Sequence, residues 1–413
     1  MERPTKRIAA ALLFAIAFHG AFAQKKTDSS VLTDKTFEGL KLRNVGPALM
    51  SGRIADIAIH PEDYNTWYIG VGSGNVWKTT NAGTTWQPVF DDQQSYSIGC
   101  VTIDPCNPHV VWVGTGENIG GRHVAYGNGV YRSTDGGANW ENRGLKESHH
   151  ISKILVHPEN TDIVWVAAQG PLWSQGGDRG LYKSTNGGKT WKKVLGDAVW
   201  TGVTDIVMDP RDPDRLVAAT WERHRNVAAY VGGGPGSGIH LSTDGGETWE
   251  KLTEGLPESN MGKIGLAISP QRPDVLYAAI ELDRRTGGVY KSTNRGATWE
   301  KQSEAVSGAT GPHYYQELYA SPYRFDRLYL VDARMQVSED GGKTFRRMNN
   351  KHKHGDDHAI AFRLDDPDYL MVGSDGGLYE SFDLEQNWRY IANLPVTQFY
   401  KIALDDAEPF YNI

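Results

Sequence analysis

One nine-residue motif occurs seven times along the chain and limits the folds that the chain can adopt. The copy at 183–191 reads Lys-Ser-Thr-Asn-Gly-Gly-Lys-Thr-Trp. The copies end on aromatic residues spaced from 43 residues (345 to 388) to 58 residues (191 to 249) apart, at Trp86, Trp140, Trp191, Trp249, Trp299, Phe345 and Trp388. Such a period is typical of a repeat array, in which one supersecondary unit is stacked many times.

Each repeat predicts four short antiparallel strands. The first unit has an apolar stretch at 54–59, a bend at His60-Pro61, strand-like stretches at 66–70 and 75–79, the repeated turn, and a last strand from Trp86. Four short strands per unit predict the blades of an all-β propeller. We expect seven blades at approximately 52–90, 96–145, 149–196, 203–257, 261–305, 313–350 and 355–395.

The repeat pattern continues past the seventh unit but is not completed. An eighth unit begins at about 396 and stops at Ile413, before its third strand and its turn. A strand-like stretch at 37–45 could supply a missing outer strand of this unit. We therefore expect a propeller domain over 37–413 that is a fragment of a longer or double propeller.

The first 23 residues are predicted to be a signal peptide. Arg3, Lys6 and Arg7 precede an apolar stretch at 8–22, and Ala21-Phe22-Ala23 fits a cleavage site. The apolar run is shorter than a membrane-spanning helix requires, and no later stretch could span a bilayer. We expect a secreted, periplasmic or cell-envelope protein with a polar segment at 24–36.

Charge and cysteine content narrow the functional classes. The net charge of −7 offers no basic stripe for phosphates, so nucleic acid is not expected as a partner. Cys100 and Cys106 flank a strand at 101–104, which would hold them farther apart than a disulfide allows. We expect two free and mostly buried thiols.

The acidic or amide residue of the repeated turn is predicted to be structural. Its carboxylate or carbonyl oxygen can accept backbone hydrogen bonds within the turn, and the following glycine permits positive φ. Asp and Asn exchange freely at this position, which a hydrogen-bond acceptor tolerates and a catalytic carboxylate does not. The seven residues are Asn81, Asp135, Asn186, Asp244, Asn294, Asp340 and Asp383.

These turns look like Asp boxes, also called BNR repeats. With the stretches at 113–118, 232–238, 354–359 and 394–400, the chain resembles secreted bacterial sortilin-type propeller proteins that are often labelled glycosyl hydrolases. It is also similar to the family seventy-four xyloglucanases. The resemblance covers 37–413 and implies that relatives continue beyond residue 413, but it says little about activity, since fold does not imply function.

The resemblance to the xyloglucanases can be tested at their catalytic residues. Their first blade carries one catalytic Asp in Tyr-Ala-Arg-Thr-Asp-x-Gly-Gly, and in the matching stretch at 68–75 that position is Gly72. Their second carboxylate lies in a second propeller, which this chain lacks, and the hydrolysis needs both. Sialidases are a weaker match, since only Arg53-Ile54-Ala55 resembles their early signature.

A functional site is expected at one end of the propeller. In this fold the first strand of each blade lines a central channel, and its start shares one face with the loops between second and third strands. Candidate ligand-binding residues on this face are Arg53, Arg122, His149, Trp173, Trp221, Arg223, Tyr314, Tyr315, His354 and His358. Candidate catalytic acids are Glu117, Asp357 and Asp375.

One cluster on this face could hold a divalent metal, the only cofactor that the sequence suggests. His354, Asp356 and His358 would share one side of an extended segment, although a hydrogen-bonded cluster explains the same residues.

Three functions follow from these observations. The first is binding of a polypeptide or polysaccharide ligand on the face that carries the candidate residues. The second is hydrolysis of a β-glucan with a site other than the familiar one, and the third is an assembly or scaffold role in the cell envelope.

Overall fold

The computed structural model describes residues 52–397, except for 120–123, 198, 284–285 and 308–315. The chain divides into two units, residues 1–46 and 47–413, and all described residues belong to the second. The predicted signal peptide, the polar segment at 24–36 and almost all of the predicted eighth unit lie outside the described residues. Within those ranges the structure contains strands and turns but no helix, and hence no helix able to cross a membrane.

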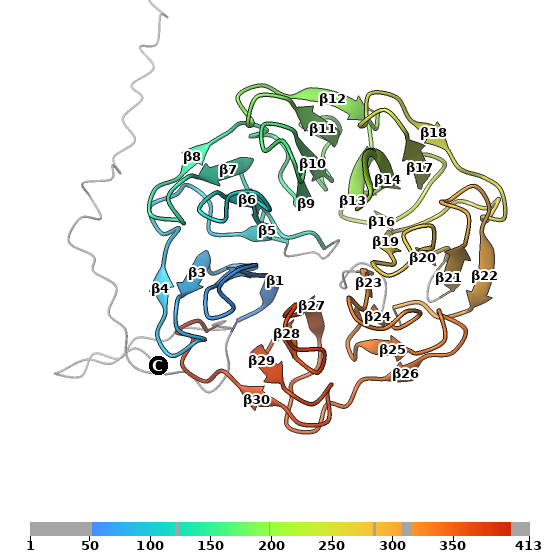
Figure 1. The fold of residues 1–413 in the computed structure, drawn as a ribbon. Helices are drawn as coiled ribbons and strands as arrows, with labels where there is room; N and C mark the ends of the chain where they lie inside the picture. The colour runs from blue at the N-terminus through green and yellow to red at the C-terminus, as the bar shows by residue number, and fades with distance from the viewer. Residues whose placement is uncertain (1–51, 120–123, 198, 284–285, 308–315, 398–413) are drawn as a thin grey trace, which may run out of the picture. The chain divides into compact units, whose positions relative to one another are not determined.

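Seven four-stranded antiparallel sheets follow one another around a ring (Figure 1), which confirms the predicted β-propeller. Blade one holds β1 (Ile54–Ile59), β2 (Trp67–Val71), β3 (Val76–Thr79) and β4 (Gln87–Pro88). Blade two holds β5 (Ile98–Ile103), β6 (Val111–Thr115), β7 (Val130–Ser133) and β8 (Glu141–Asn142). Blade three holds β9 (Ile151–Val156), β10 (Val164–Ala168), β11 (Gly180–Ser184) and β12 (Lys192–Leu195).

The fourth blade contains an insertion. It holds β13 (Thr201–Asp209), β14 (Asp212–Glu222), β17 (Gly238–Ser242) and β18 (Glu250–Lys251), with a hairpin of β15 (His224–Arg225) and β16 (Tyr230–Val231) between β14 and β17. Blade five holds β19 (Ile264–Ile268), β20 (Leu276–Glu281), β21 (Gly287–Ser292) and β22 (Glu300–Ser303). Blade six holds β23 (Leu318–Ala320), β24 (Leu328–Leu330), β25 (Gln336–Ser338) and β26 (Arg346–Arg347), and blade seven holds β27 (Asp357–Ala361), β28 (Leu370–Ser374), β29 (Gly377–Ser381) and β30 (Arg389–Tyr390).

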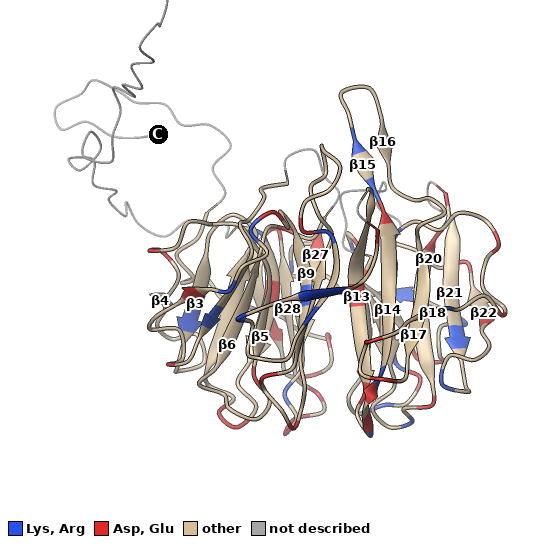
Figure 2. Ribbon diagram, turned by 90° about the horizontal axis from the view of Figure 1, so that it is seen from above, with Lys and Arg blue, Asp and Glu red and all other residues tan. Residues whose placement is uncertain are grey.

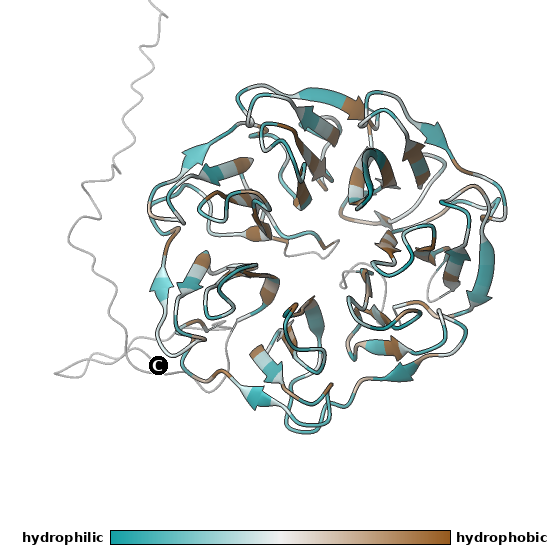
Figure 3. Ribbon diagram, viewed as in Figure 1, coloured by the Kyte–Doolittle hydropathy of each residue, from teal (hydrophilic) through white to brown (hydrophobic). Residues whose placement is uncertain are grey.

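The strand sequences explain why the blades stack. The second strands β2, β6, β10 and β28 are mainly apolar and buried along their whole length, because both faces of each sheet are covered by neighbouring blades. The outermost strands are short and hydrophilic (Figure 3). The core is therefore a series of apolar layers between successive blades.

Blade seven closes the ring by packing directly on blade one. Ile54, Trp67 and Ile69 share a buried cluster with Met371 and Leu378. At the rim the Asn393 side chain donates to the backbone carbonyls of residues 83 and 84, at 2.9 Å each. Each of the two sheets contains four strands that are consecutive in sequence, so the ring closes through side-chain packing in the part of the chain that is described.

The repeated turns connect the third and fourth strands of each blade, where they act as structural fasteners. In blade four, Asp244 accepts hydrogen bonds from the backbone N–H groups of Glu247 and Thr248, at 3.0 Å each, and from Ser242 Oγ at 2.7 Å. The closing Trp140 donates from Nε1 to the Val89 carbonyl of the preceding blade at 2.6 Å. Trp191 and Trp388 bridge to the preceding blade in the same way.

The two cysteines are free, as the sequence predicts, but only Cys100 is buried. The prediction was wrong for Cys106, which is exposed because it lies at the bend after β5 rather than inside a sheet. Its Sγ faces the Pro158 carbonyl of the next blade at 2.6 Å.

Candidate functional site

The two ends of the ring differ in what they expose. We call top face the end where the first strands begin and where the loops between second and third strands lie. The hairpin β15–β16 projects beyond this end (Figure 2). The bottom face carries the repeated turns and the loops between first and second strands.

Arg53, just before β1, joins two acids from different blades at the top of the ring. Its Nε donates to Asp375 Oδ1 of blade seven at 2.7 Å, and its NH1 group donates to Glu117 Oε1 of blade two at 3.1 Å. His358 Nε2 lies 2.8 Å from Asp375 Oδ1. The structure thus brings together four predicted site residues, of which Arg53 and Asp375 keep 24% and 31% of their side chains exposed.

The two acids have different protonation behaviour. Burial raises the pKa of Glu117, and the charge of Arg53 offsets only part of this effect. Burial also acts to raise the pKa of Asp375, but hydrogen bonds and charges from His358 and Arg53 outweigh it and hold that pKa well below its usual range. The site therefore pairs a carboxyl that retains its proton more readily with one that stays ionised.

Glu117 fills the space above Gly72. A Cβ built on Gly72 would lie 2.0 Å from Glu117 Oε1, so a larger residue at 72 would displace this carboxylate. The space beside the glycine that was predicted to match the catalytic Asp of the xyloglucanases is thus filled by a carboxylate from a neighbouring blade.

The segment 117–119 runs from β6 toward the ring axis and is fastened there by four other blades. The Glu117 carbonyl lies 2.8 Å from His150 Nδ1 of blade three. The Asn118 carbonyl accepts from Gln169 Nε2 at 3.2 Å and from Lys263 Nζ of blade five at 3.1 Å. The Ile119 carbonyl accepts from Arg223 NH1 of blade four at 3.0 Å.

The Asn118 side chain completes the attachment of this segment. Its Nδ2 donates to Glu317 Oε1 of blade six at 2.7 Å. Ile119 is buried in a cluster with Tyr329 and Val331 of the same blade. The segment is therefore a cross-link across the top of the ring, which no local sequence pattern predicted.

Charged residues also line the inner edge of the ring below the top face. In five first strands a β-bulge precedes the same inner position, which is Asp56, Cys100, Lys153, Asp205 or Ala359. Asp56 accepts from the Val101 N–H of blade two and Asp205 from the Leu266 N–H of blade five, both at 2.8 Å. Lys153 Nζ lies 3.0 Å from Asp205 Oδ1. Aligning the first strands would have revealed this ring of residues.

Most of the exposed large apolar side chains lie in loops of the top face of blades one to four. Of the seven large hydrophobic side chains that are exposed among the described residues, five lie in its loops, namely Tyr96, Tyr126, Trp173, Val199 and Val227. Tyr126 stacks on His149 with ring centroids 5.1 Å apart. The base of the hairpin is tied to the Trp173 loop by a hydrogen bond from the Arg225 N–H to the Leu172 carbonyl at 2.9 Å.

Two predicted ligand-binding residues are interior instead. Trp221 is 2% exposed and donates from Nε1 to the Gly232 carbonyl at 2.9 Å. The Arg223 side chain lies over the Trp221 ring, 5.0 Å from its centroid, and is fully buried. Both predictions were wrong because these side chains fasten the long loop of blade four and the segment 117–119 from within.

Asp357, which the sequence suggested as a candidate catalytic acid, is fully buried at the start of β27. It forms an ion pair with Lys353 and accepts from the Met335 N–H at 3.0 Å. This carboxylate therefore holds blades six and seven together.

The extended arrangement predicted for a metal site does not form. Asp356 has φ of 53°, so the backbone turns between His354 and His358. His358 faces Asp375, whereas His354 Nδ1 lies 2.7 Å from the Gly355 carbonyl. Among the described residues, no group of three or more His, Cys, Asp or Glu side chains is arranged to hold a metal ion.

The remaining candidates divide between surface and undescribed positions. His149 is half-buried on the top face, and burial lowers its pKa. Trp173 is 55% exposed, as a ligand-stacking residue would be. Arg122, Tyr314 and Tyr315 lie outside the described residues.

Over residues 52–397, apart from the gaps given above, the fold and the site define a β-propeller of seven blades with charged residues at its centre and exposed apolar side chains in the loops of its top face. Residues 128–278 match the family model described as Sortilin-Vps10, sortilin, neurotensin receptor 3. With the relatives below, this confirms the predicted resemblance to a sortilin-type propeller that is related to the family seventy-four xyloglucanases.

Curated relatives match part of the chain. An oligoxyloglucan-reducing end-specific xyloglucanase from Emericella nidulans is 25% identical over 50% of this chain and 25% of its own length. Xyloglucanase Xgh74A from Acetivibrio thermocellus is 26% identical over 56% of this chain and 28% of its own length. Photosystem II assembly lipoprotein Ycf48 from Trichormus variabilis is 28% identical over 30% of this chain and 41% of its own length. The chain thus spans only about a quarter of the two xyloglucanases.

Solved structures support the fold alone. The GH74 xyloglucanase from Xanthomonas campestris has a TM-score of 0.62 at 16% identity, over 85% of this chain and 55% of that one. YCF48 bound to D1 peptide has a TM-score of 0.52 at 15% identity, over 82% of this chain and 95% of that one.

Proposed function

We propose that this chain is an exported propeller that binds an extended polypeptide on its top face. The observation that carries this proposal is the platform of exposed side chains over blades one to four, formed by Tyr96, Tyr126, Trp173, Val199 and Val227. Large apolar side chains that gather on one face of a soluble protein commonly mark an interaction surface.

The mixture of side chains on the platform favours a polypeptide over a polysaccharide. Aromatic rings can stack on sugars or on side chains, but the aliphatic Val199 and Val227 match the apolar side chains of a peptide better. The segment 117–119 supports the same choice, because the top face already holds this stretch of extended backbone through its carbonyl groups. The solved structure of YCF48 with a bound peptide gives a precedent for such a ligand on a related fold.

Arg53 argues against cleavage at this site. A glycosidase needs its two carboxyl groups on either side of the scissile bond. Here the guanidinium group lies between Glu117 and Asp375 and donates to both. A substrate could reach both acids only by displacing this arginine.

A peptide and glycan array with the full-length protein tests the proposed function. We expect saturable binding to extended peptides, which the double variant Tyr126→Ser, Trp173→Ser weakens at least tenfold. Leu364→Ser is the matched control, since Leu364 is 64% exposed but lies in the loop between β27 and β28 on the bottom face. Binding confined to glycans, or binding that the double variant leaves unchanged, would refute the proposal.

Glycoside hydrolysis is the second candidate, favoured by one observation. Glu117 lies beside the glycine predicted to match the catalytic Asp of the xyloglucanases, and the pKa values of Glu117 and Asp375 are shifted in opposite directions by their surroundings. Such a split is typical of an acid and its ionised partner. Reducing-sugar release from xyloglucan that Glu117→Gln or Asp375→Asn abolishes would establish this function instead.

A role in assembly of the cell envelope would use the same surface. In that role a protein partner would stay bound to the platform. Peptides with that partner's sequence would then compete with the partner for the platform. Export itself rests on the predicted signal peptide, and N-terminal sequencing of secreted material beginning at Gln24 would support it.

A further inference from the structure

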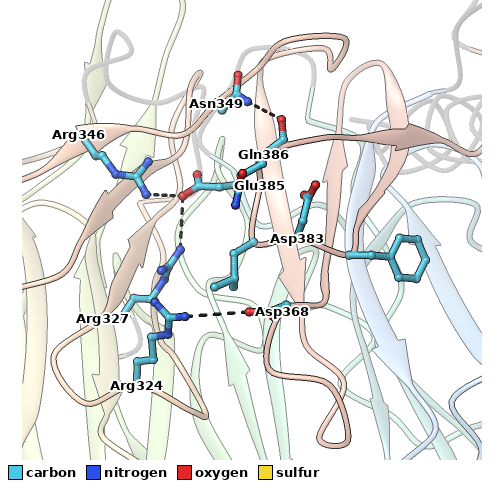
Figure 4. Close-up of a pocket in the computed structure, with 10 residues that line it drawn as sticks. Arg324, Arg327, Arg346, Asn349, Asp368, Asp383, Glu385 and Gln386 are labelled. Carbon is cyan, nitrogen blue, oxygen red and sulfur yellow. Dashed lines mark hydrogen bonds and ion pairs between the residues drawn. The ribbon is translucent and has the colours of Figure 1, made fainter.

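A pocket on the bottom face lies between blades six and seven, at the opposite end of the ring from the proposed peptide site. Its volume is about 510 Å³, within the range of small-molecule sites. Blade six contributes Arg324, Arg327, Arg346 and Asn349, and blade seven contributes its repeated turn and Asp368 (Figure 4).

The repeated turn of blade seven departs from the other six at the residue that enters this pocket. Six copies place glycine two residues after the Asp or Asn, at 83, 137, 188, 246, 296 and 342. Blade seven places Glu385 there, with φ of 73°, after Leu384 with φ of 51°. L residues rarely adopt this conformation, and such strain is concentrated at functional sites.

The glycine of the other turns packs against the preceding blade. A Cβ on Gly188 would meet the Trp112 ring at 2.9 Å, and one on Gly246 would meet Trp165 at 2.8 Å. In blade seven the Glu385 side chain instead enters a charged seam, where it is 4% exposed.

The hydrogen bonds of Glu385 involve only one of its two carboxylate oxygens. Arg327 NH2 donates to Oε1 at 3.3 Å, and Arg346 donates to the same oxygen (Figure 4). The other oxygen, Oε2, is buried and has no hydrogen-bond partner in the structure. A buried acceptor without a donor is unfavourable, and a ligand donor could satisfy it.

The mouth of the pocket offers cationic donors. Arg346 keeps 51% of its side chain exposed and Arg324 keeps 53%. The ion pair of Arg324 with Asp368 is 4.0 Å long, beyond hydrogen-bond range. Guanidinium groups bind carboxylates through paired hydrogen bonds, so these two arginines are suited to an anionic oxygen pair.

We propose that this pocket binds a sugar acid, with its carboxylate at Arg324 and Arg346 and a ring hydroxyl donating to Glu385 Oε2. The arrangement requires both groups in one ligand, since an anion alone leaves Oε2 unsatisfied and a neutral sugar adds no carboxylate to those of Asp368 and Glu385 that already face the arginines. The site is independent of the proposed peptide surface.

Titration calorimetry of the full chain with D-galacturonate tests this proposal, with D-galactose as the neutral probe. We expect saturable binding of D-galacturonate and at least tenfold weaker binding of D-galactose. Arg324→Ala and Glu385→Gly should each weaken D-galacturonate binding at least tenfold. Glu385→Gly restores the residue of the other turns and leaves Arg327 paired with Glu339 at 2.8 Å, so the variant should fold.

Arg347→Ala is the matched control, because Arg347 is the exposed neighbour of Arg346 on β26 but does not line the pocket. It should bind D-galacturonate as the parent chain does. The proposal is overturned if D-galacturonate shows no saturable binding, if D-galactose binds equally well, or if Arg347→Ala weakens binding as much as Arg324→Ala.

Discussion

The carboxyl group of Asp56 should make the free energy of unfolding depend on pH. Burial raises its pKa to about 7, although hydrogen bonds from the Val101 and Ile57 N–H groups act in the opposite direction. The folded chain therefore holds a proton that the unfolded chain releases between pH 3.8 and about 7. The free energy of unfolding should fall as the pH rises through this window and then level off.

Urea unfolding at a series of pH values tests this expectation. Between pH 5 and 8 the parent chain should lose about 2 kcal/mol, a value reduced from the full shift because Asp56 keeps some contact with water. Asp56→Asn cannot ionise and should have a flatter profile. If the free energy of unfolding of Asp56→Asn falls with pH as steeply as that of the parent chain, another group is responsible for the pH dependence.

Asp244 shows why Asp and Asn exchange in the repeated turn. Its Oδ2 accepts from the Thr248 hydroxyl at 2.6 Å, whereas Asn186 Nδ2 donates to the Thr190 hydroxyl at 2.8 Å. The threonine hydroxyl can play either role. We expect Asp244→Asn to change the free energy of unfolding by less than about 0.5 kcal/mol and Asp244→Ala to lower it by about 1–2 kcal/mol. Equal losses from both substitutions would contradict this account.

For single residues, the sequence predicted which face of the ring they lie on but not which partners they contact. The sequence placed Glu117, Asp375 and Arg53 on one face, and the structure shows in addition that Arg53 contacts both acids. Arg53 lies between the two acids because blade seven packs on blade one, which brings residues 53 and 375 together. Trp221 and Arg223 were predicted to be ligand-binding residues because an aromatic or basic residue in a long loop looks the same in sequence whether it binds a ligand or fastens the loop.

At the scale of elements, the segment 117–119 should be the most sensitive loop of the top face. Asn118→Ala removes its hydrogen bonds with Glu317 and Lys263, whose atoms lie 2.7 and 3.4 Å away. Because Glu317 and Lys263 are charged, we expect a loss of about 2 kcal/mol in the free energy of unfolding. Asn226→Ala is a suitable control, since Asn226 lies in the exposed turn of the hairpin. Equal stability of the two variants would show that the cross-link contributes little.

The strands themselves were predictable, whereas the bulges were not. Apolar runs and turn residues repeat in every unit, so the four strands of each blade follow from periodicity and turn chemistry. The bulges that direct Asp56, Lys153 and Asp205 to the inner edge depend on hydrogen bonds between strands and leave no mark in the sequence of one strand.

For the whole molecule, the weakest seam should be the one that joins the first and last blades. Asn393 bridges it with hydrogen bonds to the carbonyls of Gly83 and Thr84. Asn393→Ala should increase amide hydrogen exchange at the rim of this seam by roughly tenfold, equivalent to about 1.4 kcal/mol, because local opening becomes easier. Exchange in β10 and β20 should not change. A uniform increase across all blades would instead indicate global destabilisation.

The proposed function of the top face is to bind a polypeptide without cleaving it. The decisive measurement is fluorescence anisotropy of the best peptide from the array, titrated with the parent chain and with the double variant Tyr126→Ser, Trp173→Ser. We predict saturable binding to the parent chain, an affinity at least tenfold lower for the variant, and an intact peptide recovered afterwards. Equal affinity for both proteins would contradict the claim, as would release of reducing sugar from xyloglucan that depends on Glu117.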